Sequence, residues 1–286
     1  MMTTIRKYLS MVKFSHTIFA MPFALVGYTW ALTSTQTPFD WVLLVQVVAC
    51  MVLARNTAMG FNRWADRDID AANPRTASRE IPSGQISPRA ALTFVIINAL
   101  LFVAVAATIN RLTLLLSPVA LLVVMGYSYC KRFTALAHIV LGMGLGIAPT
   151  AAYIAVTGAF DVTAVVLSCL VLTWVGGFDI IYAMQDAEFD RGRGLHSIPA
   201  SFPGWGALSI SIALHVVSLC AVWMFGYLCE LGTLYWIGAG LFATVLTLEH
   251  LLVTPTRQKN IGIAFGTLNG IASLVFATFA ILAMVL

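Results

Sequence analysis

Oxygen-bearing side chains recur at a regular interval in the segment NRWADRDID, residues 62–70. Asn62, Asp66 and Asp70 are four residues apart, so on a helix they form one stripe. Neighbouring carboxylates on one face repel each other and raise each other's pKa unless a cation joins them. Carboxylate and amide oxygens suit a hard divalent ion, and Mg²⁺ combines few protein ligands with phosphate oxygens of a substrate. The spacing therefore predicts part of a magnesium–phosphate site.

A second acidic segment repeats this pattern 120 residues later, where Asp186 aligns with Asp66 and Asp190 with Asp70. Both segments continue into a basic stretch and close on the dipeptide IP. Four apolar segments separate the two copies, so both point the same way along the fold. We therefore expect a weak parallel internal repeat whose acidic ends face one another. The two copies cover residues 62–82 and 179–199.

Two ionisable residues, Arg55 and Asp179, lie deeper, inside apolar segments, and fall on the same two stripes. Ionisable groups inside membrane spans are functional by default. A single acidic motif could be a solvated helix end that pairs with nearby arginines. That alternative does not explain two matching copies together with these two intramembrane charges.

Basic side chains flank both acidic stripes. They are Arg67, Arg75, Arg79, Lys131, Arg191 and Arg193. Metal-binding carboxylates beside such cations are typical of a diphosphate site, because the metal bridges to the leaving oxygens and the cations neutralise the remaining charge. Each arginine taken alone is equally well explained as an anchor at the membrane surface.

The composition identifies the elements that must position these groups. The chain has 286 residues, of which 60% are hydrophobic and only 10% charged, whereas a soluble domain has roughly 25% charged residues. A spanning helix needs about 20 mostly apolar residues. Nine segments qualify: 14–34, 41–61, 90–109, 112–130, 134–156, 163–184, 207–229, 232–253 and 261–285. We expect an all-α polytopic membrane protein with about nine transmembrane helices and one domain, residues 1–286.

The placement of the basic residues predicts the orientation of this protein. With the N-terminus in the cytoplasm, all of the 16 lysines and arginines except Arg55 and Arg111 fall at the cytoplasmic ends of the spans. Both acidic segments then face the cytoplasm. The formal charge of +4 reflects this asymmetry, so it is no argument for a nucleic-acid partner. The five cysteines lack CxxC spacing and the five histidines are scattered, which argues against a metal site of those ligands.

At its acidic motifs the sequence resembles the UbiA superfamily of intramembrane prenyltransferases, closest to the 4-hydroxybenzoate polyprenyltransferase branch. The resemblance lies in NRWADRDIDA, RTASREIPSGQIS and FDIIYAMQDAEFDRGRGLHSIPA, with further support from HTIFAMPFAL and YSYCKR. It covers essentially the whole chain. It implies a ring of nine helices around a central cavity that opens toward the cytoplasm and laterally toward lipid.

The resemblance also implies roles for individual residues. Two Mg²⁺ ions on the prenyl diphosphate would be held by Asn62, Asp66, Asp70, Asp186 and Asp190. Further positions at the diphosphate or at the acceptor are matched by Arg79, Tyr127, Lys131 and Asp179. The expected catalytic set is Asp66, Asp70, Tyr127, Lys131, Asp179, Asp186 and Asp190. Arg55, together with Asp179, would meet the aromatic acceptor.

The implied reaction transfers a polyprenyl group from its diphosphate to a ring carbon of 4-hydroxybenzoate, ortho to the hydroxyl, through an allylic cation in ubiquinone synthesis. Asp179 and a diphosphate oxygen are both candidates for the base that removes the ring proton. An aminodeoxyfutalosine-type acceptor in menaquinone synthesis is the alternative within the same chemistry. From another class, a cation-coupled transporter would not explain carboxylates confined to one membrane face beside so many arginines. The expected location is a bacterial inner membrane, with no obligate protein partner.

Overall fold

The computed structural model describes residues 4–13 and 20–286, and α-helices form the framework of this part of the chain. Eight of the described helices are long and apolar enough to span a membrane. They correspond to the second through ninth predicted spans. These helices are α3 (Trp41–Ala65), α5 (Pro88–Ile109), α6 (Arg111–Cys130), α7 (Ala137–Thr157), α8 (Val162–Ala183), α11 (Trp205–Leu228), α12 (Thr233–Leu252) and α13 (Asn269–Val285). The prediction of an all-α polytopic fold is confirmed.

The first predicted span, 14–34, lies partly outside the described residues, and its described part is α2 (Met21–Thr35). The short helix α1 (Thr4–Met11) precedes it. The cytoplasmic location of the N-terminus stays a prediction of the charge distribution.

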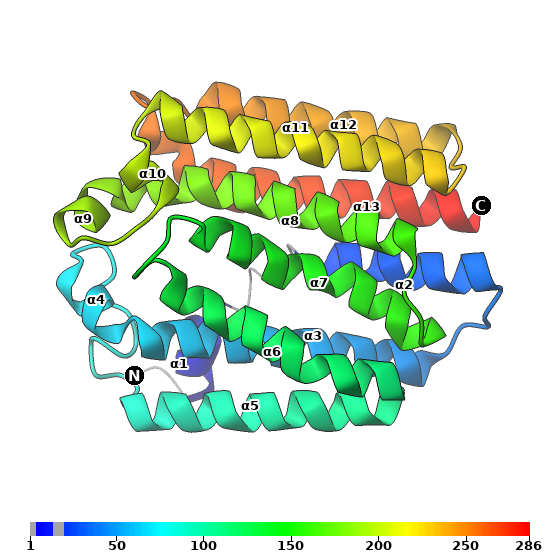
Figure 1. Cartoon of the computed structure of the whole chain (residues 1–286), viewed down its shortest axis with the longest axis horizontal. Helices are drawn as coiled ribbons and strands as arrows, with labels where there is room; N and C mark the ends of the chain where they lie inside the picture. Colours follow the sequence, from blue (N-terminus) through cyan, green and yellow to red (C-terminus); the bar gives the residue numbers. More distant parts are fainter. Residues whose placement is uncertain (1–3, 14–19) are drawn as a thin grey trace.

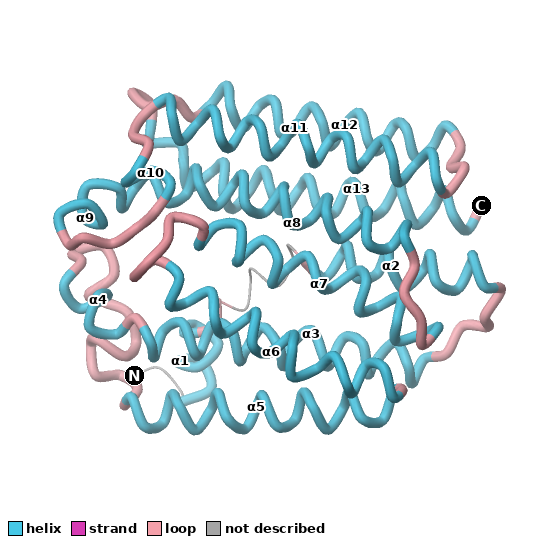
Figure 2. The backbone as a smooth tube through the Cα atoms, in the orientation of Figure 1, coloured by secondary structure: helices cyan, strands magenta, loops and turns pink. Residues whose placement is uncertain are grey.

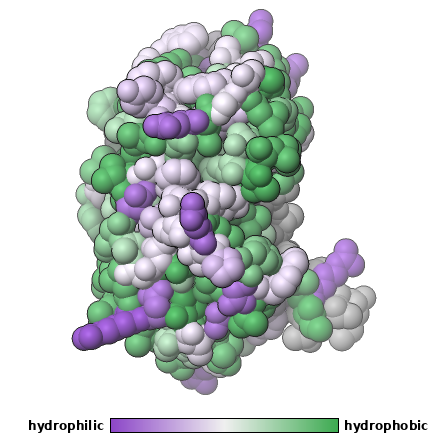
Figure 3. All heavy atoms as spheres, turned by 90° about the vertical axis from the view of Figure 1, so that its right-hand side faces the viewer, coloured by the Kyte–Doolittle hydropathy of each residue, from purple (hydrophilic) through white to green (hydrophobic). Residues whose placement is uncertain are grey.

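The long helices lie side by side, and the short helices gather at one end of the bundle (Figure 1). This end, on the left in Figure 1, contains α4 (Arg67–Ala72), α9 (Ala187–Gly192) and α10 (Ile198–Ser201). The loops that join them are also there (Figure 2), whereas the C-terminus lies at the opposite end. That opposite end, seen in Figure 3, has hydrophilic residues scattered over a largely hydrophobic surface. The two acidic segments therefore share one end of the bundle, and the C-terminus lies at the other, as an odd number of spans predicts.

Side-chain caps start several of the spans and explain polar residues outside the acidic motifs. The carboxylate of Asp40 accepts a hydrogen bond from the backbone N–H of Val42 at the start of α3. Asp161 does the same for Ala164 at the start of α8. Such caps satisfy backbone donors that a helix leaves free at its first turn. These two aspartates thus have a structural explanation that needs no ligand.

The helix α8 lies between α7 and α11 and is the most buried of the spans. Its close contact with α7 depends on Gly142, where an added Cβ would lie 2.3 Å from the backbone oxygen of Leu172. On its other side, Trp174 packs with the aromatic rings of Phe23 and Phe242. This packing fixes the position of α8, the helix that leads into the second acidic segment.

Gly142→Ala is expected to destabilise the fold, because a carbonyl oxygen of a packed helix cannot rotate away from the new methyl group. Overpacking of this kind costs about 1–3 kcal/mol. The measurement is the thermal unfolding temperature in detergent. Gly240→Ala is the matched control: an added Cβ there meets nothing within 4 Å, so removal of a helical glycine should stabilise it by up to about 1 kcal/mol. Equal unfolding temperatures for the two variants would contradict this account of the α7–α8 contact.

A buried polar network joins α8, α12 and α13. Asn269 accepts a hydrogen bond from the indole N–H of Trp174 at 2.9 Å and donates to Glu249 at 3.1 Å and to the Ala264 carbonyl at 3.0 Å. The Ala264 carbonyl belongs to the π-helical segment η4 (Ile263–Leu268), a geometry that leaves carbonyls displaced from the regular ladder. The asparagine thus holds an irregular turn in place within the spans.

Candidate functional site

The first acidic segment forms two helices rather than one. The helix α3 ends at Ala65, and α4 begins again after Asp66, whose backbone has φ −96° and ψ 5°. The Asp66 N–H still bonds the Asn62 carbonyl at 2.9 Å, and the Asp70 N–H bonds the Asp66 carbonyl at 2.8 Å. The side-chain amide of Asn62 also donates to Asp66 at 3.1 Å. The predicted stripe therefore continues across the break.

The second acidic segment breaks at the aligned residue. After α8 ends, a 3-10 turn, η2 (Met184–Asp186), leads into α9, and Asp186 has φ −106° and ψ 1°. Asp66 and Asp186, which the 120-residue offset aligns, thus share one sparsely populated backbone conformation. Asp190 lies one turn further on, half-buried in α9.

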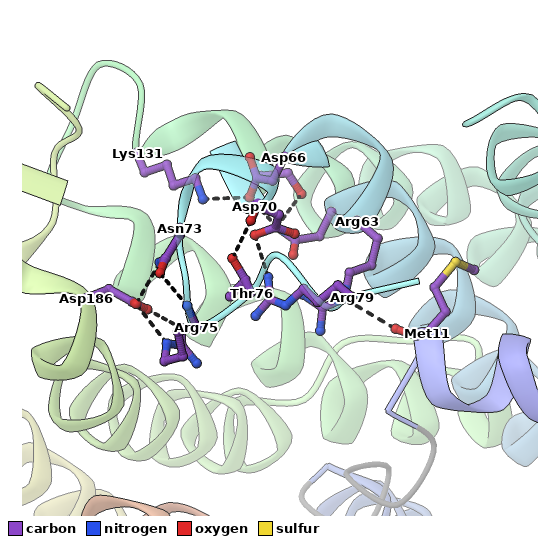
Figure 4. Close-up of polar contacts among 12 residues, drawn as sticks. Met11, Arg63, Asp66, Asp70, Asn73, Arg75, Thr76, Arg79, Lys131 and Asp186 are labelled. Atoms are coloured by element: carbon purple, nitrogen blue, oxygen red, sulfur yellow. Dashed lines mark hydrogen bonds and ion pairs between the residues drawn. The ribbon is translucent and has the colours of Figure 1, made fainter. Parts of the chain in front are cut away.

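The loop that follows α4 contacts the second acidic segment (Figure 4). The amide of Asn73 donates to Asp186 at 3.0 Å, and the guanidinium of Arg75 donates its Nε to the same carboxylate at 2.8 Å and pairs with it through Nη2. Arg75 also donates to the Tyr182 hydroxyl at 3.0 Å. Burial lowers the pKa of Arg75, but its hydrogen bond to Asp186 and the charges around it raise that pKa above its ordinary value. The two acidic ends therefore meet, as the repeat predicts.

Cationic side chains also engage the carboxylates of the first segment. Lys131 approaches Asp66 at 2.7 Å and Arg132 at 3.3 Å, while Arg79 pairs with Asp70 at 2.6 Å. Asp66 is 2% and Asp70 4% exposed. Buried carboxylates need such partners, because desolvation of an unpaired charge is costly. Three aspartates from the two motifs are thus neutralised by four cations at one end of the bundle, and these seven side chains are called the ion-pair cluster below.

The donor set of the cluster fits a magnesium ion. Its ligand atoms are carboxylate oxygens, to which the neighbouring Asn62 can add an amide oxygen, and Oδ2 of Asp70 is buried without a hydrogen-bond partner among the described residues. Within residues 4–13 and 20–286, no three His, Cys, Asp or Glu side chains converge on one point. A magnesium ion here would therefore have few protein ligands and would need oxygens from a substrate.

Three of the predicted basic residues lie outside the ion-pair cluster. Arg67 pairs with its exposed neighbour Asp68 at 3.6 Å. Arg191 donates its Nε to a backbone carbonyl of α10 at 3.3 Å, and Arg193 lies over the ring of Phe189. The described geometry does not bring these three arginines to the carboxylates.

An apolar cavity of about 530 Å³ lies among α3, α6, α7 and α8. Tyr127 lines it about one helical turn before Lys131, Arg55 lines it about three turns before Asp66, and Phe160 lines it near the far ends of α7 and α8. The Nη2 of Arg55 reaches the Lys13 carbonyl only at 3.5 Å, and its Nε is buried without a partner in the described part of the chain. The apolar cavity therefore begins close to the ion-pair cluster and extends away from it among the spans.

Two side chains at this site are not among the site residues predicted from the sequence. Arg132 follows Lys131 directly and reads as a membrane-surface anchor, yet it pairs with Asp66. His138 is one of several scattered histidines, yet its Nδ1 lies 2.7 Å from Oδ2 of Asp179. Arg132 is next to Lys131 and ends the segment YSYCKR, whereas no feature of the sequence singles out His138.

Comparison with known proteins places these features in context. The model of the UbiA prenyltransferase family matches residues 20–284. The 4-hydroxybenzoate octaprenyltransferase of Aeromonas hydrophila is 32% identical over 250 residues, which cover 87% of this chain and 86% of the relative. The enzyme of that name from Polynucleobacter asymbioticus is 30% identical over 249 residues, 86% of either chain.

Solved structures of two UbiA homologs have a similar fold. A UbiA homolog from Aeropyrum pernix K1 has 34% sequence identity and a TM-score of 0.84, over 94% of this chain and 98% of that one. A UbiA homolog from Archaeoglobus fulgidus bound to GPP and Mg²⁺ has a TM-score of 0.75, over 98% of this chain and 100% of that one. At 19% identity, this second likeness concerns the fold alone.

Proposed function

This chain belongs to the UbiA prenyltransferase family, and on that premise we propose that it transfers a polyprenyl group from a polyprenyl diphosphate to a ring carbon of 4-hydroxybenzoate, ortho to the hydroxyl. The acceptor is inferred from the names of relatives that match most of this chain. We place the reaction at the cytoplasmic face of a bacterial inner membrane. The observation that supports this function best is the ion-pair cluster at the end of an apolar cavity.

The ion-pair cluster would bind the diphosphate. Magnesium, when bound, neutralises charge on the leaving oxygens; the residues that would hold it are Asn62, Asp66, Asp70, Asp186 and Asp190. Arg75, Arg79 and Lys131 already lie against these carboxylates. They are therefore placed to bind phosphate oxygens, with Arg supplying paired donors that match the geometry of phosphate.

The cavity would hold the isoprenoid and protect the allylic cation. Its walls are mostly apolar side chains, which exclude water from a cation that water would otherwise capture. Tyr127 lines the cavity beside the cluster and presents an aromatic face, which attracts a cation electrostatically. The rest of the chain can extend along the apolar walls toward Phe160.

The acceptor would bind between the cluster and the cavity. Arg55 lines the cavity, and its buried Nε–H has no partner among the described residues, which suits a carboxylate such as that of 4-hydroxybenzoate. Asp179 lies two helical turns before Asp186 on α8 and offers a carboxylate for the proton that leaves the ring. In this arrangement the ring would lie between the acceptor-binding cation and the base.

Membranes that contain the protein are expected to convert geranyl diphosphate and ring-labelled 4-hydroxybenzoate into a lipophilic product when Mg²⁺ is present. EDTA should abolish the product and excess Mg²⁺ should restore it, because charge on the leaving diphosphate is otherwise uncompensated. Extraction of label into organic solvent is the measurement, and membranes without the protein are the control. Formation of equal product in EDTA would contradict the metal assignment. Product from another aromatic acceptor only would overturn the choice of 4-hydroxybenzoate.

A further inference from the structure

We propose that His138 is a positioning residue that orients the carboxylate of Asp179 to accept the proton released from the aromatic ring. This inference rests on the proposed prenyl transfer and assigns its proton-removal step. It depends on four features: the hydrogen bond between the two side chains, the tautomer of the imidazole, the loop that fixes the imidazole, and the position of Asp179 along α8 between the cavity and the ion-pair cluster.

The hydrogen bond joins the first turn of α7 to the middle of the site. His138 is the second residue of α7, and its Nδ1 lies 2.7 Å from Oδ2 of Asp179. The side chain of His138 is 6% exposed and that of Asp179 is 19% exposed. The imidazole is thus fixed in the protein interior, while part of the carboxylate remains accessible. One carboxylate oxygen is held by the imidazole, and a carboxylate has a second oxygen with which to accept a proton.

The other ring nitrogen determines the tautomer. The backbone N–H of Ile198 donates to Nε2 of His138 at 3.4 Å. A nitrogen that accepts a hydrogen bond carries no proton, so the neutral imidazole has its proton on Nδ1 and donates it to Asp179. A neutral donor stabilises the ionised carboxylate and fixes its orientation, which is what a carboxylate base requires before it takes a proton.

The loop that holds the imidazole also holds a member of the ion-pair cluster. Two residues before Ile198, the backbone N–H of His196 donates to the Lys131 carbonyl at 2.7 Å. Lys131 in turn pairs with Asp66. The segment that closes the second acidic motif therefore fixes both the partner of the proposed base and a cation of the diphosphate site. Because one loop contacts both His138 and Lys131, a shift of this loop would move the proposed base and the diphosphate site together.

Asp179 lies close to the space where the ring would bind. Asp179 lies on α8 about two helical turns after Leu172, which lines the apolar cavity, and about two turns before Asp186 of the ion-pair cluster. The carboxylate therefore lies between the ion-pair cluster and the cavity. That is where the ring must be if its carbon is to bond the allylic carbon of a prenyl group whose diphosphate is in the cluster.

The C–O bond between the allylic carbon and the diphosphate breaks, and its electron pair leaves with the diphosphate. The ring carbon then donates an electron pair to the allylic cation, and the new C–C bond leaves that ring carbon with one hydrogen too many. The C–H bond then breaks, its electron pair restores the aromatic ring, and the proton moves to a carboxylate oxygen of Asp179. The Nδ1–H of His138 stays on the other oxygen and keeps the carboxylate oriented throughout.

The test compares His138→Ala with His138→Asn, using geranyl diphosphate and 4-hydroxybenzoate as substrates. We expect His138→Ala to lower kcat by about 10- to 100-fold, less than the roughly 10²–10⁴ that a general base itself contributes, with little change in either KM. His138→Asn, which restores a neutral side-chain donor at the position of Nδ1, should recover most of this loss. With 4-hydroxybenzoate deuterated ortho to its hydroxyl, the isotope effect on kcat should be larger in His138→Ala than in the unsubstituted protein.

His215→Ala is the matched control, because His215 is equally buried but bonds His250 and the Trp174 carbonyl, outside the site. It should lower the unfolding temperature and leave kcat and the isotope effect of the folded protein unchanged. If His138→Ala behaves like this control, or if its kcat is unaltered, the proposed role is wrong. Absence of product from the unsubstituted protein with every acceptor tested would instead overturn the prenyl transfer on which the role rests.

Discussion

Asp66→Asn and Asp186→Asn are each expected to lower the rate of prenyl transfer by about 10²- to 10³-fold, a loss of roughly 3–4 kcal/mol in transition-state stabilisation. Each aspartate is placed by a helix break with the same backbone conformation. Asn62, Lys131 and Arg132 contact Asp66, and Asn73 and Arg75 contact Asp186. Asparagine preserves the volume but removes the charge. It can neither bind a divalent ion strongly nor balance the cations around it, so the diphosphate loses its support as a leaving group.

The measurement is kcat with geranyl diphosphate at saturating Mg²⁺, together with the thermal unfolding temperature of each variant. Asp68→Asn is the control, because the side chain of Asp68 is 86% exposed and points away from the stripe. It should retain the activity of the unsubstituted protein. If Asp66→Asn were as active as Asp68→Asn, the assignment of Asp66 to the diphosphate site would be wrong.

Arg55→Met is expected to raise KM for 4-hydroxybenzoate by about 10- to 100-fold while it leaves the protein as stable as before or more stable. A hydrogen bond between charged groups contributes about 1.5–3 kcal/mol, and Arg55 is the cation that lines the cavity. In the described part of the chain its Nε has no partner. Replacing a poorly compensated buried charge by an apolar side chain of similar size is often neutral or stabilising. Loss of acceptor binding and retained stability are therefore expected together.

The methyl ester of 4-hydroxybenzoate separates this role from general damage, because the ester has no negative charge for Arg55 to bind. The unsubstituted protein should prefer the acid over the ester, and Arg55→Met should lose that preference. Arg55→Lys should restore part of it, since lysine supplies charge without the planar pair of donors. An unchanged preference for the acid in Arg55→Met would show that the carboxylate binds elsewhere.

Periodicity and charge predict the spans well, because each span must satisfy its own backbone in lipid and so leaves a long apolar signature. The predicted segment 112–130 and the observed α6, Arg111–Cys130, differ by one residue at the start. Asn110 explains the boundary: its side chain caps the helix by accepting from the Thr113 N–H at 2.8 Å. Local capping of this kind is readable from sequence once the apolar segment is known.

The break at Asp66 and the contact between Arg75 and Asp186 are not readable in the same way. The spacing of Asn62, Asp66 and Asp70 predicts one stripe on a single helix, and that spacing does not change when the ψ angle of one residue changes. The stripe therefore continues across the two helices α3 and α4, and the sequence does not reveal the break between them. The Arg75–Asp186 pair joins residues 111 apart in the sequence, and only the packing of the helices brings them together. Arg191 and Arg193 show the converse, since closeness in sequence to Asp190 does not bring them into the ion-pair cluster.

The role of His138 could not be predicted from the sequence for a different reason. A lone histidine near the start of an apolar helix is usually a satisfied core residue, and the chain contains four others. Its meaning depends on α7 and α8 packing so closely that the imidazole reaches Asp179. The same glycine contact that stabilises these two helices is therefore a condition for the proposed proton transfer.

The pairing of each buried aspartate with arginine or lysine has a thermodynamic consequence. Binding a metal alone would strand Arg75, Arg79 and Lys131 without counter-charge, and binding diphosphate alone would strand the aspartates. If the proposed site binds both ligands, each would provide the charge that the other displaces, so their binding would be linked and each would tighten the other by the same factor. On the proposed function, the internal salt bridges of the ion-pair cluster would therefore be replaced most favourably when metal and diphosphate bind together.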